Sequence, residues 1–397
     1  MKLSQNNRIE IFNEHRKTRV AYIFNHSYFL GGGEISFFEL IRKLDSKWFE
    51  PIAIVPKEGE IERKLLRNNI DVYINKFPTI KITYNGSPLI ALISLIKFLK
   101  RKKIEIVHAN GSRVCLYAGI AGKILGIPII WHVRETIQDI FWYDCLLGRL
   151  SSKIICVSKS VQKKRFTMFG KFINNKIIVV HNGVDTNIFK KDLAARSRVR
   201  EELGLDGQIL FGMVGNFVPL KGQDFFLKGF AEAKRRIPNL QAKVLLVGRP
   251  LDKAYYKSLV RLSRKLNIKS DIIYKYYRHD IHEILSALDI FALPSKREGF
   301  SRSMLEAMSC ELPVIATKIS EIEEAIVDNK NGILVDFMHV EQMTSAIIKL
   351  CKNNSMRNEI GTRNRLDVET KFDLASHANR IESLYLRFIR RNIHVKS

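Results

Sequence analysis

The chain has 397 residues, of which 46% are hydrophobic and 10% aromatic, which suffices for two domains with real cores and excludes a disordered chain. Its formal net charge is +26, and residues 1–190 carry +16 of it, with 31 Lys and Arg against 15 Asp and Glu. A surface this basic attracts phosphorylated ligands, anionic lipid or nucleic acid, or is simply a solvated Lys-rich surface, so charge alone excludes none of these.

Cysteine usage and hydropathy point to the cytoplasm. The five cysteines stand at scattered positions without metal-ligand spacing, so we expect buried thiols in a reducing compartment: Cys115, Cys145, Cys156, Cys310 and Cys351. Residues 1–17 are polar and lack the apolar centre of a signal peptide. The longest apolar stretch, residues 88–99, is shorter than the ~20 residues of a membrane span. We therefore expect a protein that is soluble or peripheral to the membrane.

Short apolar, β-rich runs alternate with helical patterns along the first half of the chain. The predicted strands cover residues 19–24, 49–55, 71–74, 104–109, 128–132, 153–157 and 176–181. Helical patterns lie between most of them, for example at residues 34–44, 88–102 and 113–125. Such alternation predicts an α/β domain with a doubly wound parallel sheet.

The second half repeats the alternation and predicts a second domain of the same class. Its strands are expected at residues 208–214, 242–247, 272–274, 290–293, 314–316 and 332–335. The polar, charged stretch 190–206 is the predicted linker. The expected parts are a polar tail (1–18), an N-terminal Rossmann-like domain (19–190), a C-terminal Rossmann-like domain (191–373) and a last helix (374–397) with too many charges on one face to be fully buried. Ligands of open α/β sheets bind beyond the carboxyl ends of the strands, so two such domains facing each other would leave a cleft there.

Glycines follow the first predicted strand and open a helix at Glu34. Gly31, Gly32 and Gly33 would let the backbone approach a ligand closely, and a helix N-terminus offers free N–H groups to an anion. The spacing differs from the dinucleotide-binding fingerprint, and a plain tight turn is the alternative.

Two histidines, His108 and His132, end neighbouring strands of the first half. Either can be a core histidine, but two at the mouth of one sheet favour a functional role, above all for His132. The Asn182-Gly183 turn after the last strand of this half is either a binding loop or a turn into the linker.

In the second half, Asn216 and then Lys221-Gly222 follow the first strand. A lysine on a Gly-flanked loop before a helix can hold a phosphate as a point charge, whereas the alternative is a surface lysine.

The segment from Glu298 to Glu306 carries the clearest chemical signal. Ser301 is a candidate N-cap for a helix running through Met308, and the amides of Arg302 and Ser303 would face an anion at the helix N-terminus. Carboxylates beside a phosphate site are suited to accept hydrogen bonds from ribose or hexose hydroxyls.

This carboxylate pair with seven residues between its members, followed by residues 307–317 (Ala-Met-Ser-Cys-Glu-Leu-Pro-Val-Ile-Ala-Thr), resembles glycosyltransferase family 4, whose members are retaining enzymes of the GT-B fold. The resemblance runs from Arg19 to the C-terminal helix. Further matching pieces are residues 31–34, His132, Ser158, residues 182–185, Lys221-Gly222, residues 289–295 and residues 332–335. Departures from the family pattern are Asn216, Tyr276 and Ser320-Glu321.

The resemblance implies roles for the matching residues. Glu298 and His132 would contact the transferred sugar at the reacting centre, and Glu306 would hold the ribose hydroxyls. The implied donor-binding set is Gly32, Gly33, Asn216, Lys221, Arg302, Ser303 and Glu306. No metal or other cofactor is implied, because Lys221 and the helix N-terminus would stabilise the leaving diphosphate. The last helix would cross back onto the first domain, which would be the acceptor side.

We therefore expect a retaining hexosyl- or N-acetylhexosaminyltransferase that uses a nucleoside-diphosphate sugar, with UDP favoured over GDP. Basic clusters at residues 97–103 and 163–165 suggest a partner in the anionic inner face of the plasma membrane and an acceptor that is lipid-linked, a lipopolysaccharide or another cell-surface glycan. The alternatives are a GT-B sugar-nucleotide epimerase or a nucleic-acid-binding protein, although no nucleic-acid-binding signature is present and no such partner is expected.

Overall fold

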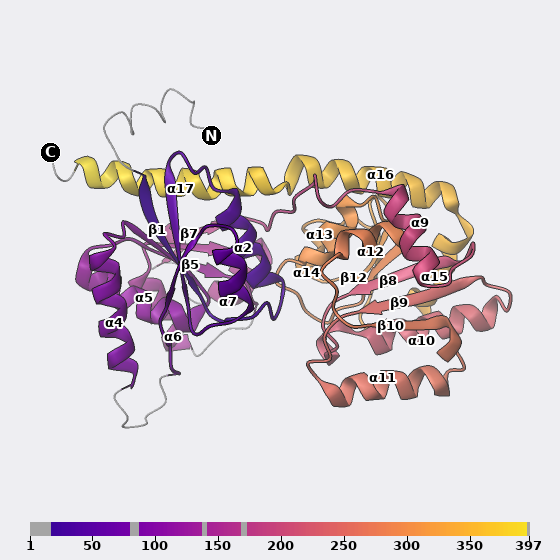
Figure 1. Cartoon of the computed structure of the whole chain (residues 1–397). Coiled ribbons are helices and arrows are strands. Elements are labelled where there is room, and N and C mark those ends of the chain that lie inside the picture. The colour runs from indigo at the N-terminus through magenta and orange to yellow at the C-terminus, as the bar shows by residue number, and fades with distance from the viewer. Residues whose placement is uncertain (1–16, 80–86, 137–140, 168–172, 395–397) are drawn as a thin grey trace. The chain divides into compact units, whose positions relative to one another are not determined.

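The chain divides into two compact units (Figure 1). The computed structural model describes residues 17–79, 87–136, 141–167 and 173–394. Unit 1 comprises Met1–Asn182 and Leu374–Ser397, and unit 2 comprises Gly183–Asp373. The division falls after Asn182, where the sequence suggested residue 190, because the intervening segment pairs within unit 2, for example through the bridge of Val184 to Asp373. The expected polar tail lies outside the described residues except for Lys17 and Thr18.

Unit 1 is built on seven parallel strands in the order β3-β2-β1-β4-β5-β6-β7. They are β1 (Thr18–Phe24), β2 (Phe49–Val55), β3 (Asp71–Ile74), β4 (Ile106–Asn110), β5 (Ile129–Val133), β6 (Lys153–Cys156) and β7 (Ile177–Val179). The seven predicted strands are thus confirmed with small differences at their ends. Strands β2 and β3 lie on one side of β1, and β4 to β7 lie on the other, so the strand order reverses between β1 and β4. Ligands of such sheets bind at this reversal, which makes the carboxyl ends of β1, β4 and β5 the expected place for a ligand site.

Helices cover both faces of this sheet. They are α2 (Gly32–Lys43), α3 (Glu60–Leu66), α4 (Ser87–Arg101), α5 (Ser112–Leu125), α6 (Phe141–Leu150), α7 (Lys159–Phe166), the short η2 (Asn174–Lys176) and α17 (Leu374–His394). The last helix, α17, packs beside α2, and α4, α5 and α6 lie on the opposite side of the sheet (Figure 1). Tyr22, Phe37 and Tyr385 are among the buried residues that join β1, α2 and α17 in one core.

Unit 2 has six parallel strands in the order β10-β9-β8-β11-β12-β13. They are β8 (Ile209–Val214), β9 (Ala242–Val247), β10 (Ile272–Lys275), β11 (Ile290–Leu293), β12 (Val314–Thr317) and β13 (Ile333–Val335), and each was predicted from the sequence. The order again reverses next to the first strand, between β8 and β11. The loops after these two strands carry the residues that the sequence singled out.

The helices of unit 2 enclose a core rich in phenylalanine. They are α9 (Leu193–Glu202), η3 (Pro219–Lys221), α10 (Gln223–Arg236), α11 (Lys253–Lys265), η4 (Lys269–Asp271), α12 (Ile281–Ala287), α13 (Arg302–Ser309), α14 (Ser320–Glu323), α15 (Val340–Lys352) and α16 (Asn354–Lys371). Phe225, Phe226 and Phe230 of α10 pack with Phe211 of β8 and Met343 of α15. No helix in the described part of either unit is long and apolar enough to cross a membrane.

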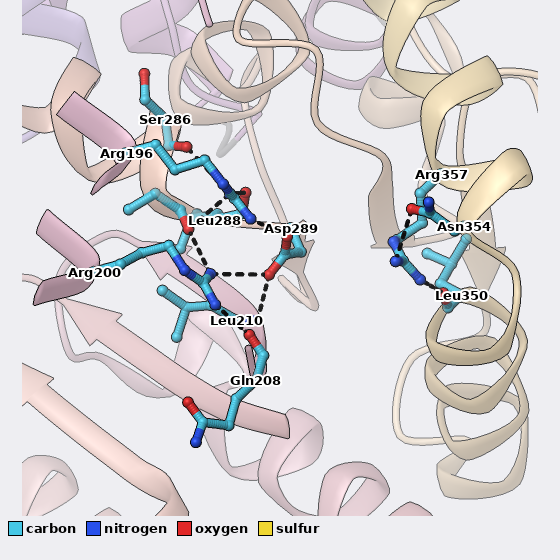
Figure 2. Close-up of polar contacts among 11 residues, drawn as sticks. Arg196, Arg200, Gln208, Leu210, Ser286, Leu288, Asp289, Leu350, Asn354 and Arg357 are labelled. Atoms are coloured by element: carbon cyan, nitrogen blue, oxygen red, sulfur yellow. Dashed lines mark hydrogen bonds and ion pairs between the residues drawn. The ribbon is translucent and has the colours of Figure 1, made fainter. Parts of the chain in front are cut away.

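The prediction that residues 190–206 form a linker is wrong. The segment contains α9, and Asp192 caps the start of this helix by accepting a hydrogen bond from the amide of Ala195. Figure 2 shows how Arg196 and Arg200 of α9 converge on Asp289, at 2.6 and 3.2 Å from its carboxylate oxygens. Two of the charges that suggested a solvated linker pair with a carboxylate that lies 93 and 89 residues later in the sequence, so α9 is an integral part of unit 2.

The five cysteines carry no disulfide. Cys115, Cys156 and Cys310 are buried as expected, whereas Cys145 and Cys351 are only half-buried. Burial raises the pKa of the Cys115 and Cys156 thiols to about 12, which leaves both as thiols at neutral pH.

Candidate functional site

A close backbone approach in unit 2 positions Lys221. The residue ends the single turn η3, and Gly222 then adopts φ 65°, the left-handed conformation that disfavours other residues. A Cβ atom on Gly222 would lie 2.1 Å from the carbonyl oxygen of Pro294, so only glycine lets the loop after β8 meet the turn after β11. The amide of Lys296 also donates to the carbonyl of Leu220. The two loops are therefore held together beneath Lys221.

This contact brings Lys221 to Glu298. The lysine Nζ lies 2.7 Å from Oε1 of Glu298, whose side chain is 9% exposed while that of Lys221 is 27% exposed. The sequence predicted both residues for the site, and the structure pairs them directly. A cation held by one carboxylate on the rim of a sheet can exchange that partner for a phosphate oxygen.

Helix α13 begins beside this ion pair, as predicted, with Ser301 as its N-cap. The Ser301 hydroxyl accepts a hydrogen bond from the amide of Met304 at 3.4 Å. In the described part of the chain, the amides of Arg302 and Ser303 donate to no other group. Two unpaired N–H groups at the positive end of a helix, with Lys221 on the next loop, are suited to bind an anion.

Glu306 lies on the second turn of α13 and is paired within the helix. Nε of Arg302 donates to its Oε1 at 2.6 Å, and both side chains are buried. The sequence assigned Arg302 only a role for its backbone amide and missed this side-chain contact, although the i,i+4 spacing of opposite charges on a helix is the signal that reveals it. The arginine fixes the orientation of the Glu306 carboxylate.

The backbone of Asn216 and the side chain of Ser303 make local contacts next to these pairs. The carbonyl of Asn216 accepts a hydrogen bond from the Gln223 side chain at 3.1 Å, which ties the loop after β8 to the start of α10. The Ser303 hydroxyl lies 3.4 Å from that of Ser301 at the head of α13. Tyr276, one of the departures from the family pattern, follows β10 and is 66% exposed.

In unit 1, Gly32 and Gly33 form the first turn of α2. A Cβ atom on Gly33 would lie 3.0 Å from Cδ of Arg134, so the glycine leaves room for that arginine. Burial raises the pKa of Glu34 in the same turn, and the charges of His26 and Arg134 partly oppose this shift. Gly33 thus makes room for a side chain that follows β5, a contact that the sequence did not predict.

His132 lies on β5 within a buried pair of imidazoles. Its Nδ1 is 3.1 Å from Nε2 of His108, and the two rings stack with centroids 5.2 Å apart. Both side chains are fully buried, and burial, with a further contribution from the charge of Arg134, lowers the pKa of each well below its usual value. Both rings are therefore neutral near pH 7.

Arg134 is the residue of this region that the sequence reasoning missed. Its guanidinium donates to Oδ1 of Asn110 at 2.6 Å and to Oδ1 of Asn182 at 2.9 Å, and its Nη2 lies 3.4 Å from Nδ1 of His132. The signal was its position two residues after His132 at a strand end, next to the strand that ends at Asn110. The structure thus joins His132, Gly33 and Asn182 around one arginine.

Comparison with known proteins relates both units to one group of enzymes. A family described as Glycosyltransferase Family 4 matches residues 30–188, and one described as Glycosyl transferases group 1 matches residues 195–367. The chain is 24% identical over 314 residues to UDP-Gal:alpha-D-GlcNAc-diphosphoundecaprenol alpha-1,3-galactosyltransferase of Escherichia coli (75% of this chain, 79% of the relative). It is 27% identical over 324 residues to the capsular polysaccharide biosynthesis glycosyltransferase CapM of Staphylococcus aureus (77% and 82%). The crystal structure of Anabaena HepE in complex with UDP and glucose has the same fold, with a TM-score of 0.82, 20% identity and coverage of 93% of this chain and 99% of that one.

Proposed function

Since the chain belongs to glycosyltransferase family 4 and is a glycosyltransferase of the GT-B fold, we propose that it transfers a hexose or N-acetylhexosamine from a UDP-sugar to a hydroxyl of a lipid-linked or polysaccharide acceptor, with retention of the anomeric configuration. Relatives named for lipid-linked and capsular polysaccharide synthesis support this class of acceptor, which is typical of bacterial cell-surface glycans.

The observation that carries the proposal is the pairing of Lys221 with Glu298 beside the unpaired amides of α13. A diphosphate bound at these amides would take Lys221 as its counter-ion and release the Glu298 carboxylate toward the sugar that the diphosphate carries. Glu306, oriented by Arg302, would accept hydrogen bonds from the ribose hydroxyls. One small region would then hold the ribose, the diphosphate and the sugar of the donor.

In the proposed reaction, the bond between the anomeric carbon and the diphosphate oxygen breaks and the electron pair leaves with the diphosphate. Lys221 and the α13 N-terminus stabilise the negative charge that develops, so the site uses no metal. The acceptor hydroxyl attacks the oxocarbenium-like carbon from the face that the diphosphate leaves, and its proton passes to the departing phosphate oxygen. Glu298 and His132 contact the sugar during transfer, and no side chain becomes a covalent nucleophile.

The preference for UDP rests on the relatives. The Escherichia coli relative is named for UDP-Gal, and HepE was crystallised with UDP and glucose. These are properties of those proteins, and they make uridine diphosphate sugars the first donors to test for this chain.

The surface of α4 supports a peripheral position on the inner face of the plasma membrane. Its exposed side presents apolar side chains in the first half, with Leu89 61%, Ile90 69% and Ile93 43% exposed. The same side carries Lys97 and the basic end Lys100-Arg101 one and two turns further on. Apolar residues that enter the lipid boundary beside lysines that meet anionic headgroups are the features of an interfacial helix.

A donor screen on the full-length protein tests the proposed function. Thermal unfolding is recorded with UDP-glucose, UDP-galactose, UDP-N-acetylglucosamine and GDP-mannose, and each sugar nucleotide is then incubated alone and with undecaprenyl-diphosphate-linked sugars. We expect stabilisation by a UDP-sugar and an α-linked product. Stabilisation by GDP-mannose alone would refute the choice of base, and conversion of a sugar nucleotide without an acceptor into its epimer would identify an epimerase.

Sedimentation with liposomes tests the membrane partner separately. We expect the protein to co-sediment with vesicles of phosphatidylglycerol and phosphatidylethanolamine and not with phosphatidylcholine alone. Leu89→Ser should weaken binding, whereas Leu366→Ser, at a 60% exposed position on α16, is the matched control and should not. Equal binding to both kinds of vesicle, or equal loss in both variants, would contradict the assignment.

A further inference from the structure

We infer that Arg134 is a positioning residue that fixes the tautomer of His132, so that His132 carries its proton on Nε2 and acts as a hydrogen-bond donor. The inference deepens the proposed function on which it rests. It makes Nε2 of His132 a hydrogen-bond donor toward the sugar and excludes that nitrogen as a base. The proton positions follow from the buried network of unit 1, step by step.

The guanidinium of Arg134 sets the first proton, since it has N–H donors only and stays charged. Its Nη2 lies 3.4 Å from Nδ1 of His132, and Asn110 and Asn182 hold it there through hydrogen bonds of 2.6 and 2.9 Å. The contact is long for a hydrogen bond, but the sign of its energy depends on the tautomer. A lone pair on Nδ1 attracts the cation, whereas an N–H would point at it and be repelled. Nδ1 of His132 is therefore the acceptor.

The donor and the acceptor of each remaining hydrogen bond in this series then follow. His108 places Nε2 at 3.1 Å from the same Nδ1, so His108 must donate from Nε2. A neutral imidazole has one proton, which leaves Nδ1 of His108 as an acceptor for the Tyr385 hydroxyl at 2.7 Å. The Tyr385 oxygen in turn accepts from the Tyr22 hydroxyl at 2.8 Å. Every hydroxyl and ring proton in this series then has one place, and the reverse order would bring the Nδ1–H of His132 against the N–H groups of Arg134.

The same conclusion is consistent with the ionisation of the groups. Burial lowers the pKa of both histidines and raises the pKa of Tyr22 and Tyr385, so all four are neutral near pH 7. The last proton of the series lies on Nε2 of His132, which is buried and has no hydrogen-bond partner among the described residues. Buried polar groups are normally hydrogen-bonded, so this N–H is available to an oxygen that arrives with a ligand.

Nuclear magnetic resonance of the full-length protein with ¹⁵N-labelled histidine tests the inference directly, because two-bond ¹H–¹⁵N correlations distinguish protonated from unprotonated ring nitrogens. The His132 signals are identified by their loss in His132→Gln. Near neutral pH we expect Nε2 of His132 protonated and Nδ1 unprotonated. A protonated Nδ1 would overturn the inference. The measurement needs no substrate, so it stands apart from any failure of the transfer assay.

Two arginine variants test the part played by Arg134. Arg134→Met removes the cation that orients the series, and we expect His132 to populate both tautomers. Arg113→Met is the matched control, since Arg113 also holds an asparagine at a strand end, with hydrogen bonds of 3.1 and 2.6 Å to Asn25, and it should retain the wild-type tautomer. Unchanged His132 signals in Arg134→Met, or equal changes in both variants, would show that Arg134 does not fix the tautomer.

Discussion

The pairing of Lys221 with Glu298 predicts opposite effects of the two residues on binding of the nucleotide and on transfer of the sugar. In Lys221→Met, the diphosphate loses one charged hydrogen bond, worth about 1.5–3 kcal/mol, so the affinity for UDP should fall about 10- to 100-fold. In Glu298→Gln, the lysine loses its competing carboxylate, while UDP, which lacks the transferred sugar, loses no contact. UDP should then bind as tightly as to the wild type or up to about tenfold more tightly, whereas the rate of transfer falls at least about 100-fold.

The thermal stability of both variants must be measured as well, because Lys221→Met leaves the nearly buried carboxylate of Glu298 without its cation. Lys221 is 27% exposed, so we expect solvent to limit the loss of stability to about 1–2 kcal/mol, or a few degrees in the melting temperature of unit 2. Isothermal titration with UDP at fixed ionic strength, on protein shown to be folded at that temperature, measures the affinity.

The contrast between the two variants is what tests the reasoning. Wild-type affinity for UDP in Lys221→Met would show that the lysine does not hold the diphosphate. A loss of UDP affinity in Glu298→Gln as large as in Lys221→Met would show that the carboxylate serves the nucleotide and not the sugar.

Three further predictions concern stability. Burial lowers the pKa values of His108 and His132 in the folded state, so as the pH falls below the usual histidine value the unfolded chain binds protons first. The free energy of unfolding of unit 1 should therefore fall by about 1.4 kcal/mol per pH unit for each histidine until the pKa of the folded state is reached. Urea denaturation between neutral and mildly acidic pH measures this fall, and an unchanged midpoint would contradict it. Gly222→Ala should lower the free energy of unfolding of unit 2 by at least about 2 kcal/mol, because of the positive φ at this position and the contact with Pro294, and should also weaken UDP binding. A melting temperature equal to that of the wild type would show that the loop relaxes freely. Asp289→Asn should lower the free energy of unfolding of unit 2 by about 2 kcal/mol, because it weakens the ion pairs with Arg196 and Arg200. A change smaller than the error of the thermal unfolding measurement would show that these ion pairs do not hold α9 to unit 2.

Much of the fold was predictable because parallel strands buried on both faces leave a strong local signal. All strands of both sheets appear where short apolar runs alternate with helical patterns, and Ser301 caps α13 as its sequence indicated. The stretch 190–206 could not be assigned correctly, because its helix depends on Asp289, far along the chain, and a local pattern of charges cannot distinguish solvated residues from paired ones.

The candidate site divides in the same way. By itself the sequence singled out the candidate residues, since Glu298, Glu306 and Lys221 come after strands and the two histidines lie near strand ends, where ligands of such sheets bind. Only the tertiary structure decided which of them meet. Tyr385 reaches His108 across 277 positions of sequence, and Gly222 lets two separate loops close on each other so that Lys221 contacts Glu298. Such contacts depend on the packing of α17 on the first sheet and on the close approach of two backbones, and neither leaves a periodic trace in the sequence.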